Sequence, residues 1–477
     1  MKVPLRPPPF EQALKAIFAL KDGVGRFEAL INEKLGPAPG GKYRHWDTFR
    51  HALPLADYPA EQQWVVVKLA RHAIYRTLPL LDTQLEPFKY ALPNIALEML
   101  HQADRNAAGN IKGSDQVTNP ATRDTYLFKS FVEEAITSSQ LEGASTTRRV
   151  AKAMIQEGRA PRTRSERMIA NNYKAMLYVR KFFDRPLTPE LVIELQRVLT
   201  EETFDEPDGA GRFRRTDEDI VVEDETGTRL HTPPPADELE SRMRTMCDFA
   251  NGVGDDEFIP PAVRAILLHL WLAYDHPFVD GNGRTARALF YWSMARQGYW
   301  LCEYVSISRI LKKARGQYAR AFLYTESDEN DATYFILYQL RVLLRAISDL
   351  HDYLARKASE IEEAEELVRR ASAIHGQLNP RQIALINHAL KNARARYTVG
   401  SHQRSHGVSY ESARSDLMKL VEQSLLNQHK AGRAFVFTPS RDLRQHLGAP
   451  PSGTEGAQPL PDTARLGLRS VRKTPLG

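Results

Sequence analysis

The sequence contains very little cysteine. Only Cys247 and Cys302 occur among 477 residues, so a disulfide framework and a zinc cluster are excluded. This cysteine usage is typical of a reducing compartment, and we expect a cytoplasmic protein. No apolar run reaches the ~18–20 residues that a membrane-spanning helix needs, and Met1–Pro9 lacks the apolar core of a signal peptide. We therefore expect no membrane partner.

Neither sign of charge dominates. The chain has 65 Lys and Arg against 59 Asp and Glu, a net charge of +6, and 42% hydrophobic residues, which is ordinary for a globular protein. Its length predicts two to four domains. A P-loop is also missing, because no Gly-x-x-x-x-Gly-Lys-Ser/Thr run occurs.

One short run carries several chemically active side chains. Residues 276–287 read His-Pro-Phe-Val-Asp-Gly-Asn-Gly-Arg-Thr-Ala-Arg, between a predicted buried helix over 262–274 and a second helix over 285–297 that ends at Gly298. The Gly-Asn-Gly segment therefore lies at a helix N-terminus. Free backbone N–H groups and the helix dipole favour an anion there.

The residue types in this run suit a phosphorylated nucleotide. Gly281 and Gly283 allow a close backbone approach. Arg284 and Arg287 are three residues apart, so we expect them to share a face of the first turn and to offer two guanidinium groups to a polyphosphate.

A base and a metal ligand complete the run. His276 can accept a proton from an attacking hydroxyl, and Asp280 is the single carboxylate that Mg²⁺ commonly uses beside phosphates. The alternative is a capped helix turn with a solvated histidine and surface arginines. The joint pattern favours the nucleotide site.

This run resembles the signature of the Fic family, His-x-Phe-x-Asp/Glu-Gly-Asn-Gly-Arg-x-x-Arg, at every defined position. The resemblance implies a nucleotidyltransferase that moves AMP from ATP, with Mg²⁺, to a Ser, Thr or Tyr hydroxyl of a target protein. It implies that His276 is the catalytic base, Phe278 anchors the loop in the core and Asp280 holds the metal. The implied phosphate-binding residues are Gly281, Asn282, Gly283, Arg284 and Arg287.

A second motif lies upstream. Residues 126–143 predict an amphipathic helix that stops at Gly143, with Ser138 and Glu142 four apart on one face. The segment resembles the Fic inhibitory motif, Ser/Thr-x-x-x-Glu-Gly/Asn, in the subgroup whose inhibitory helix is N-terminal to the core. That implies a Glu142–Arg287 pair that obstructs the γ-phosphate and makes the enzyme autoinhibited. A surface glutamate before a capping glycine is the alternative.

A β-hairpin is predicted between these motifs. Residues 219–231 form two strand-like runs around the turn Asp224–Gly227. In the Fic family such a hairpin is a flap beside the active site that pairs with a target peptide, and Arg212 matches the arginine often found before it. An ordinary surface hairpin is the alternative. Residues 166–175 resemble an early helix of the Fic core, and Tyr318 either stacks near the nucleotide base or belongs to the core.

The predicted fold class is mainly α. The Fic core over 125–345, with its β-hairpin flap, follows a separate helical module over 1–115. A linker helix over 346–374, a winged helix-turn-helix over 375–440 and a disordered tail over 441–477 are predicted after it. The first module contains Gly41–Arg50, which resembles a Trp-Asp segment ahead of the Fic core in some bacterial members. Its His45, Asp47 and Arg50 either bind a ligand or merely dock helices.

The C-terminal module has a basic composition. Residues 378–440 contain nine Lys or Arg and three Asp or Glu, which suits phosphate contacts with DNA. Helices are predicted over 378–390, 398–404 and 408–421, followed by a strand pair over 425–437. Tyr410, Ser412 and Arg414 are the candidate groove residues, and protein contact is the alternative role.

The leading hypothesis is thus an autoinhibited protein adenylyltransferase. Two alternatives stay open. One is a deAMPylase that uses the same site in reverse. The other is a DNA-binding regulator, acting through 375–440, whose Fic fold only senses a nucleotide. Because Fic proteins often dimerise, a homodimer is a further partner to test.

Overall fold

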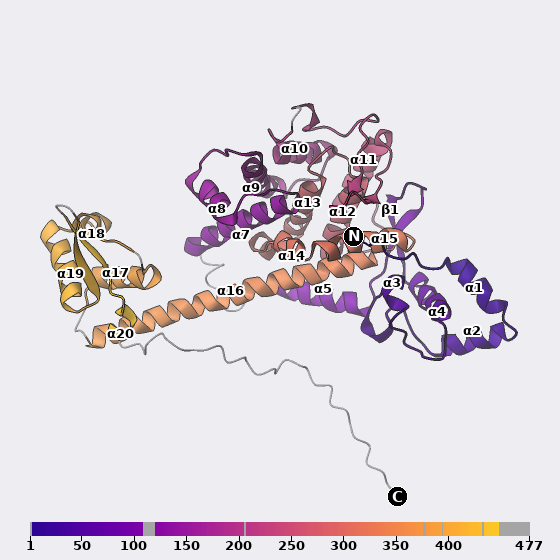
Figure 1. Cartoon of the computed structure of the whole chain (residues 1–477), viewed down its shortest axis with the longest axis horizontal. Coiled ribbons are helices and arrows are strands. Elements are labelled where there is room, and N and C mark those ends of the chain that lie inside the picture. Colours follow the sequence, from indigo (N-terminus) through magenta and orange to yellow (C-terminus); the bar gives the residue numbers. More distant parts are fainter. Residues whose placement is uncertain are drawn as a thin grey trace, which may run out of the picture. The chain divides into compact units, whose positions relative to one another are not determined.

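The computed structural model describes residues 2–107, 120–204, 207–374, 378–393, 395–431 and 434–447, and divides at Leu354 into two compact units. The first unit is mainly helical, as predicted (Figure 1). Thr147, Thr163 and Thr188 begin helices by accepting a hydrogen bond from a backbone N–H three residues further on.

The helices that begin in this unit are α1 Phe10–Phe18, α2 Gly23–Asn32, α3 Trp46–Phe49, α4 Ala60–His72, α5 Asn94–Ala107, α7 Pro120–Leu141, α8 Arg148–Glu157, α9 Arg164–Phe182, α10 Pro189–Thr200, α11 Leu239–Asn251, α12 Pro261–Asp275, α13 Asn282–Arg296, α14 Ile307–Lys313, α15 Arg315–Ser327 and α16 Thr333–Ile374. Within the described ranges, each helix is too short or too polar to cross a lipid bilayer.

The strands of the described residues form antiparallel hairpins. The pairs are β1 Arg76–Leu81 with β2 Pro87–Tyr90, β3 Val222–Glu223 with β4 Arg229–His231, and β5 Leu426–Ala431 with β6 Ala434–Pro439. The β3–β4 hairpin is the predicted flap, and Val222 pairs with His231. The β1–β2 hairpin was not expected.

The N-terminal residues are part of the first unit. Leu78, Phe88 and Tyr90 of the β1–β2 hairpin are buried in the main hydrophobic core, and Lys68 of α4 forms a buried ion pair with Asp328, 2.9 Å apart. The expectation of a separate module over 1–115 is therefore wrong. The alternating apolar residues of an unpredicted hairpin join the two regions.

The centre of the first unit is the pair α12 and α13, which lie side by side (Figure 1). Trp271 and Trp292 are buried in it. Nearly all of α12 is buried, because apolar residues occupy every side of the helix. The loop between these helices is thus held on both sides by rigid, packed elements.

Helix α16 differs from the prediction. A boundary was expected between 345 and 346, but one helix runs from Thr333 to Ile374. The sequence has no glycine or proline in this span to interrupt it. The division into units falls within the helix, where buried residues such as Leu343 and Leu354 give way to charged ones.

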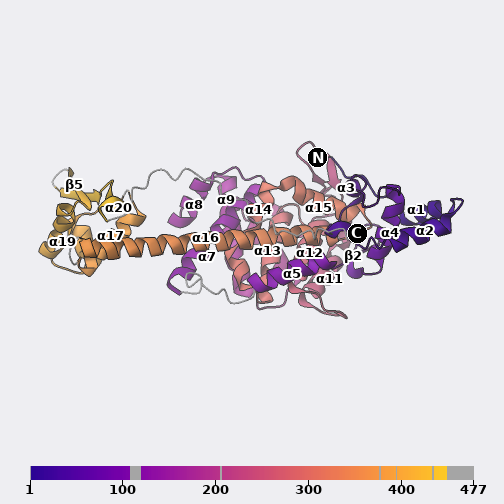
Figure 2. The same ribbon diagram turned by 90° about the horizontal axis from the view of Figure 1, so that it is seen from below.

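The second unit contains three helices followed by a hairpin, in the predicted order. Figure 2 labels α17, α19 and β5 of this unit. These helices are α17 Pro380–Lys391, α18 Val399–His406 and α19 Tyr410–Glu422. Their N-caps are Asn379, Thr398 and Ser409. A further β-bridge joins Tyr397 to Phe437 of β6.

The second unit extends beyond 440. Residues 441–447 were expected to belong to a disordered tail, but they include the short helix α20 Leu443–His446. Leu443 and Leu447 are buried in the core of this unit with Leu417 and Phe437, so apolar burial explains the difference. The rest of the predicted tail, 448–477, lies outside the described residues.

Candidate active site

The loop between α12 and α13 has a fixed backbone. His276 caps α12 in the left-handed conformation, with φ of 45°, and Gly281 precedes α13 with φ of 88°. Arg214 clamps the first turn of the loop: its backbone N–H donates to Pro277 O over 2.9 Å, and its Nε donates to His276 O over 3.0 Å. The predicted loop is therefore present, and Arg214 bonds to two of its carbonyl groups.

Two side chains hold the loop from inside. Phe278 is fully buried, as expected for an anchor, and packs against Phe213 at 5.9 Å between ring centroids. Asn282 accepts from Phe278 N over 2.9 Å and donates to Phe278 O over 2.7 Å. The Asn282 side chain thus bridges the backbone of the loop through one donor and one acceptor.

His276 is in the protonation state that a base needs. Its Nδ1 lies 3.2 Å from Ala273 O, and because a carbonyl can only accept, Nδ1 carries the proton and Nε2 keeps its lone pair. Burial lowers the pKa of His276 to about 4. At neutral pH the imidazole is therefore uncharged and able to accept a proton.

A cavity of about 190 Å³ lies beside His276. Its walls come from the end of the α7 segment, the flap, α12, α13 and α15. The flap contributes Val222, Leu230 and His231, so it lies where the Fic resemblance implied. Tyr318 and Phe322 of α15 form an aromatic wall.

The predicted pair of Glu142 and Arg287 is present. Arg287 donates from its terminal nitrogen to Glu142 Oε1 over 2.8 Å and from Nε to Ser138 Oγ over 2.9 Å. The same terminal nitrogen also reaches Ser138 O, 3.1 Å away. Arg287 is only 1% exposed, and its guanidinium is bound by Ser138 and Glu142.

Glu142 also covers the first turn of α13. A Cβ atom added to Gly283 would clash with Glu142 Oε1, so a side chain at this position would require the carboxylate to move. The N-terminus of α13, where backbone N–H groups favour an anion, is thus covered by an anion of the chain itself.

Arg284 does not share the face of Arg287. Its side chain is fully buried, and its guanidinium donates to Leu199 O over 2.9 Å and to Asp280 Oδ2 over 3.0 Å. The expectation of two guanidinium groups on one face is wrong in this structure. The carbonyl of Leu199 at the C-terminal end of α10 attracts the cation to the other side.

Asp280 is the one loop carboxylate. Its Oδ1 accepts from Gly281 N over 2.5 Å and its Oδ2 accepts from Arg284, while its side chain is 37% exposed. Each oxygen keeps a further lone pair. Among the described residues, no group of three or more His, Cys, Asp or Glu could hold a metal. The site therefore fits only an ion that takes most ligands from phosphate and water.

Three residues of the site carry no sequence signal that we could use. Gln196 of α10 donates to Asp280 O over 3.0 Å and accepts from Gly211 N over 2.6 Å. Arg214 and His231 come from segments far from the loop in sequence. Their functional positions depend on tertiary packing alone.

His231 fixes the flap. Its Nδ1 lies 2.8 Å from Glu326 Oε2 and its Nε2 lies 2.7 Å from Tyr274 O. Because both partners are acceptors, the ring donates from both nitrogens and is an imidazolium. Burial opposes this charge, but the hydrogen bond and charge of Glu326 raise the pKa of His231 above its ordinary value.

In the second unit, α19 presents two of the three expected groove residues. Tyr410 and Arg414 are exposed, whereas Ser412 is only half-exposed and its backbone N–H and hydroxyl engage Ser409 at the helix cap. Asp416, one of three acidic residues between 378 and 440, is buried and pairs with Arg381 over 2.7 Å. The other charged residues of α19 are exposed, and they are Glu411, Arg414, Lys419 and Glu422.

Known proteins share part of this chain. Residues 186–294 match the family model described as Fic/DOC family. A protein adenylyltransferase Fic from Nematostella vectensis is 28% identical over 300 residues, covering 60% of this chain and 65% of the relative. The protein adenylyltransferase fic-1 of Caenorhabditis elegans is 27% identical over 183 residues, covering 37% of this chain and 33% of the relative. The chain thus spans less than two thirds of these relatives.

A solved structure has a similar arrangement. The crystal structure of a Fic family protein from Desulfovibrio desulfuricans G20 aligns with a TM-score of 0.48 and 18% identity, covering 72% of this chain and 95% of that protein. The family match includes His276, the whole loop that follows it and all of α13 except its last two residues. The chain contains a Fic/DOC family domain, and the loop with His276, Asp280 and Arg287 lies in the matched span, whereas Glu142 and the α15 wall of the cavity lie outside it.

Proposed function

We propose that this protein is a protein adenylyltransferase that its own Glu142 holds inactive. One observation carries the proposal: the neutral base His276 faces a cavity whose arginine, Arg287, is already bound to Glu142. The relatives are named protein adenylyltransferases, which supports AMP as the transferred group. The free thiols of Cys247 and Cys302 support a reducing, cytoplasmic location.

The proposed reaction uses His276 as a general base. A Ser, Thr or Tyr hydroxyl oxygen of the target attacks the α-phosphorus of ATP while its proton passes to His276 Nε2. The bond from the α-phosphorus to the bridging oxygen breaks, and pyrophosphate leaves with that electron pair. The target then carries AMP as a phosphodiester. The proton donated by Nδ1 to Ala273 O keeps Nε2 directed at the hydroxyl.

The loop would bind the phosphates through its backbone. The free N–H groups at the start of α13, around Gly283, favour the developing negative charge. Asp280 would hold Mg²⁺, which supplies charge neutralisation to the phosphates when bound. Arg284 would act indirectly in this structure, because it orients the Asp280 carboxylate.

Inhibition follows from competition for Arg287. Its Nε and one terminal nitrogen are occupied by Ser138 and Glu142, so a γ-phosphate would have to displace a carboxylate. The carboxylate also lies within reach of Gly283, at the entrance to the helix N-terminus. A triphosphate and Glu142 would therefore exclude each other in the productive position.

The test is transfer of radiolabel from α-labelled ATP to protein, including self-modification. Wild type, Glu142→Gly and Glu142→Gly with His276→Ala are compared. We expect a weak, a strong and a background signal in that order. Equal signals from wild type and Glu142→Gly would reject the inhibitory role of Glu142. The absence of a signal with every labelled nucleotide would reject the transferase activity. A purified AMP-modified target, obtained with Glu142→Gly and identified by mass spectrometry, then tests the reverse reaction.

For the second unit we propose binding to duplex DNA through α19. The exposed Tyr410 and Arg414 and the neutralisation of Asp416 by Arg381 support it. Gel shifts with genomic fragments at increasing salt are the test. Binding that weakens steeply with salt and is reduced by Arg414→Ala is expected, and binding indifferent to both would reject the proposal.

A further inference from the structure

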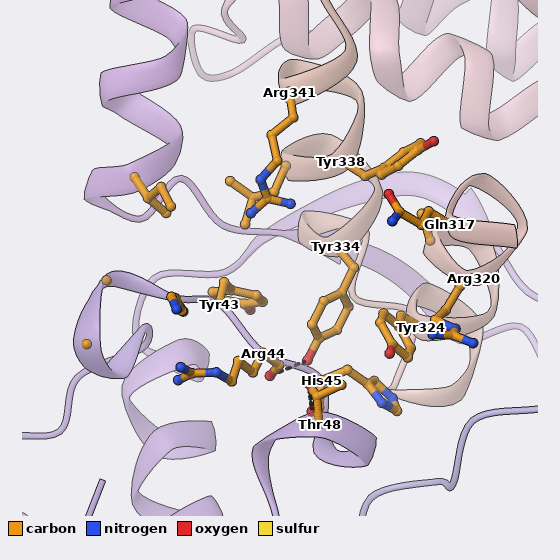
Figure 3. Close-up of a pocket in the computed structure, with 16 residues that line it drawn as sticks. Tyr43, Arg44, His45, Thr48, Gln317, Arg320, Tyr324, Tyr334, Tyr338 and Arg341 are labelled. Carbon is orange, nitrogen blue, oxygen red and sulfur yellow. Dashed lines mark hydrogen bonds between the residues drawn. The ribbon is translucent and has the colours of Figure 1, made fainter. Parts of the chain in front are cut away.

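A second, larger cavity lies on the opposite side of α15 from the candidate active site. Its volume is about 570 Å³, within the range of small-molecule sites. The segment 40–48, which the sequence singled out without a chemistry, forms one wall, and α15 and α16 form the other (Figure 3). The active site described above uses none of the residues that line this cavity.

The charge of this second cavity has one sign. Four cationic side chains line it and no Asp or Glu does; the cations are Lys42, Arg44, Arg320 and Arg341. Among the described residues none of the four forms an ion pair, in contrast to Arg287 and His231. In Figure 3 the Arg341 guanidinium extends above Tyr43 and Tyr334, and Arg44 and Arg320 lie on opposite sides. An anion is the ligand that such a lining favours.

Aromatic rings make up the rest of the lining. His45 stacks on Tyr324, with ring centroids 4.3 Å apart and an interplanar angle of 10°. Burial lowers the pKa of His45 to about 4, so this ring is neutral. The Tyr338 hydroxyl is buried and has no hydrogen-bond partner within the described part of the chain. The cavity is thus lined by aromatic rings as well as cations.

Buried hydrogen bonds hold these rings in place. Tyr334 donates to Asp328 Oδ2 over 2.7 Å, and Tyr43 donates to Asp331 Oδ2 over 2.5 Å. Arg71 lies over the Tyr43 ring, 3.7 Å from its centroid. Asp328 and Asp331, which lie behind these rings, therefore accept hydrogen bonds from the tyrosines. Neither of them forms an ion pair with the arginines that line the cavity.

We propose that this cavity binds a nucleotide, at a site separate from the ATP site of the transferase. Arginine guanidinium groups match phosphate oxygens in pairs, and tyrosine rings stack on a planar base. Unpaired arginines, stacked rings and a volume of nucleotide size occur together here. A cavity that served only to pack helices together would not need several cations that lack acidic partners. The same is true of an ordinary solvated surface.

Helix α15 gives this site a physical connection to the other cavity. Gln317, Arg320 and Tyr324 face the second cavity, whereas Tyr318, Phe322 and Glu326 face the first. These two sets follow helical spacing on opposite sides. A nucleotide bound to Arg320 would contact the same helix whose Glu326 fixes the flap through His231.

Calorimetric titration of the full chain with ADP tests the proposal, because ADP has no pyrophosphate to lose and is not consumed by AMP transfer. We compare wild type with Arg320→Ala/Arg341→Ala. The matched control is Arg345→Ala, one turn beyond Arg341 on α16, whose side chain is 68% exposed and pairs with Asp349. Pyrophosphate is titrated in parallel. Melting curves check that each variant is folded.

The expected result is two classes of ADP site in wild type and in Arg345→Ala, one of which weakens at least tenfold in the double variant. Identical isotherms for wild type and the double variant would overturn the proposal. Pyrophosphate binding as tight as that of ADP would also overturn it, since the rings would then contribute nothing. If the proposed transferase site does not bind nucleotide, the class of ADP site that is insensitive to the double variant would be missing. The class assigned to the second cavity would be unchanged.

Discussion

The two cavities beside α15 differ in how their cations are neutralised. In the candidate active site Arg287 binds Glu142 and His231 binds Glu326. In the second cavity the arginines lack acidic partners among the described residues. The difference indicates that a phosphate reaches Arg287 only after the Glu142 carboxylate leaves, whereas the arginines of the second cavity are open to an anion as they stand. The following experiments test this contrast.

The largest effect is expected at the base. His276→Ala in the Glu142→Gly background should lower AMP transfer by about 10²–10⁴-fold, the usual contribution of a general base. Initial rates with labelled ATP measure it. A double variant as active as Glu142→Gly would mean that the unblocked cavity does not use His276.

Removing the Glu142 carboxylate should leave Arg287 without an acidic partner, like the arginines of the second cavity. Glu142→Gly leaves Arg287 free for phosphate, and we expect transfer to rise at least about tenfold, since hydrogen bonds to charged groups contribute about 1.5–3 kcal/mol. Glu142→Gln keeps the shape without the charge and is the matched control, with a smaller rise expected. An unchanged rate in both variants would contradict competition for Arg287.

The hydroxyl of Ser138 should have a smaller effect. Ser138→Ala removes one acceptor of Arg287 Nε, worth about 1 kcal/mol or roughly fivefold in rate. Ser139→Ala is the control, because that hydroxyl donates to Met168 O and does not contact Arg287. A larger rise for Ser139→Ala than for Ser138→Ala would point to helix destabilisation instead of a released arginine.

A carboxylate introduced into the second cavity should make it resemble the first. Gln317→Glu places an acid three residues before Arg320, on the same face of α15. Because exposed pairs contribute only about 0.2–1 kcal/mol, ADP affinity at this site should fall up to about fivefold. Gln317→Ala, which adds no charge, should fall less. Tighter binding by Gln317→Glu would show that the arginines do not meet the phosphates.

The smallest effect is expected from pH. With a pKa near 4, His276 stays deprotonated from pH 5.5 to 8, so transfer by Glu142→Gly should change less than about twofold over this range and decrease only as pH falls toward 4. An imidazole with the ordinary pKa of 6.5 would lose about tenfold by pH 5.5. A profile of kcat against pH distinguishes the two.

The loop chemistry was predictable because it is local. His276, Asp280 and the glycines lie within twelve residues, and the i, i+4 spacing of Ser138 and Glu142 fixes their common face. The ion pair with Arg287 followed from the resemblance, and the structure contains it. In the second unit, the three predicted helices are present, and each begins at a residue type that favours helix N-termini.

Other features depend on contacts between distant segments. The direction of Arg284 is set by Leu199 O, eighty-five residues away, and helical spacing alone could not reveal it. The β1–β2 hairpin has only short strands and an irregular register. The expected boundaries at 115, 345 and 440 differ from those of the structure. Buried residues of the N-terminal hairpin belong to the core of the first unit, and burial continues past 345 and past 440. No local sequence pattern reports such burial.

The left-handed backbone of His276 has a consequence for protein design. A residue other than glycine resists this conformation by about 1–2 kcal/mol, and Arg214 opposes that resistance by bonding to the carbonyls of His276, Pro277 and Pro234. A twelve-residue signature transplanted into another helical hairpin would therefore relax and misdirect its imidazole. The smallest portable unit is the loop together with the distant arginine that keeps it bent.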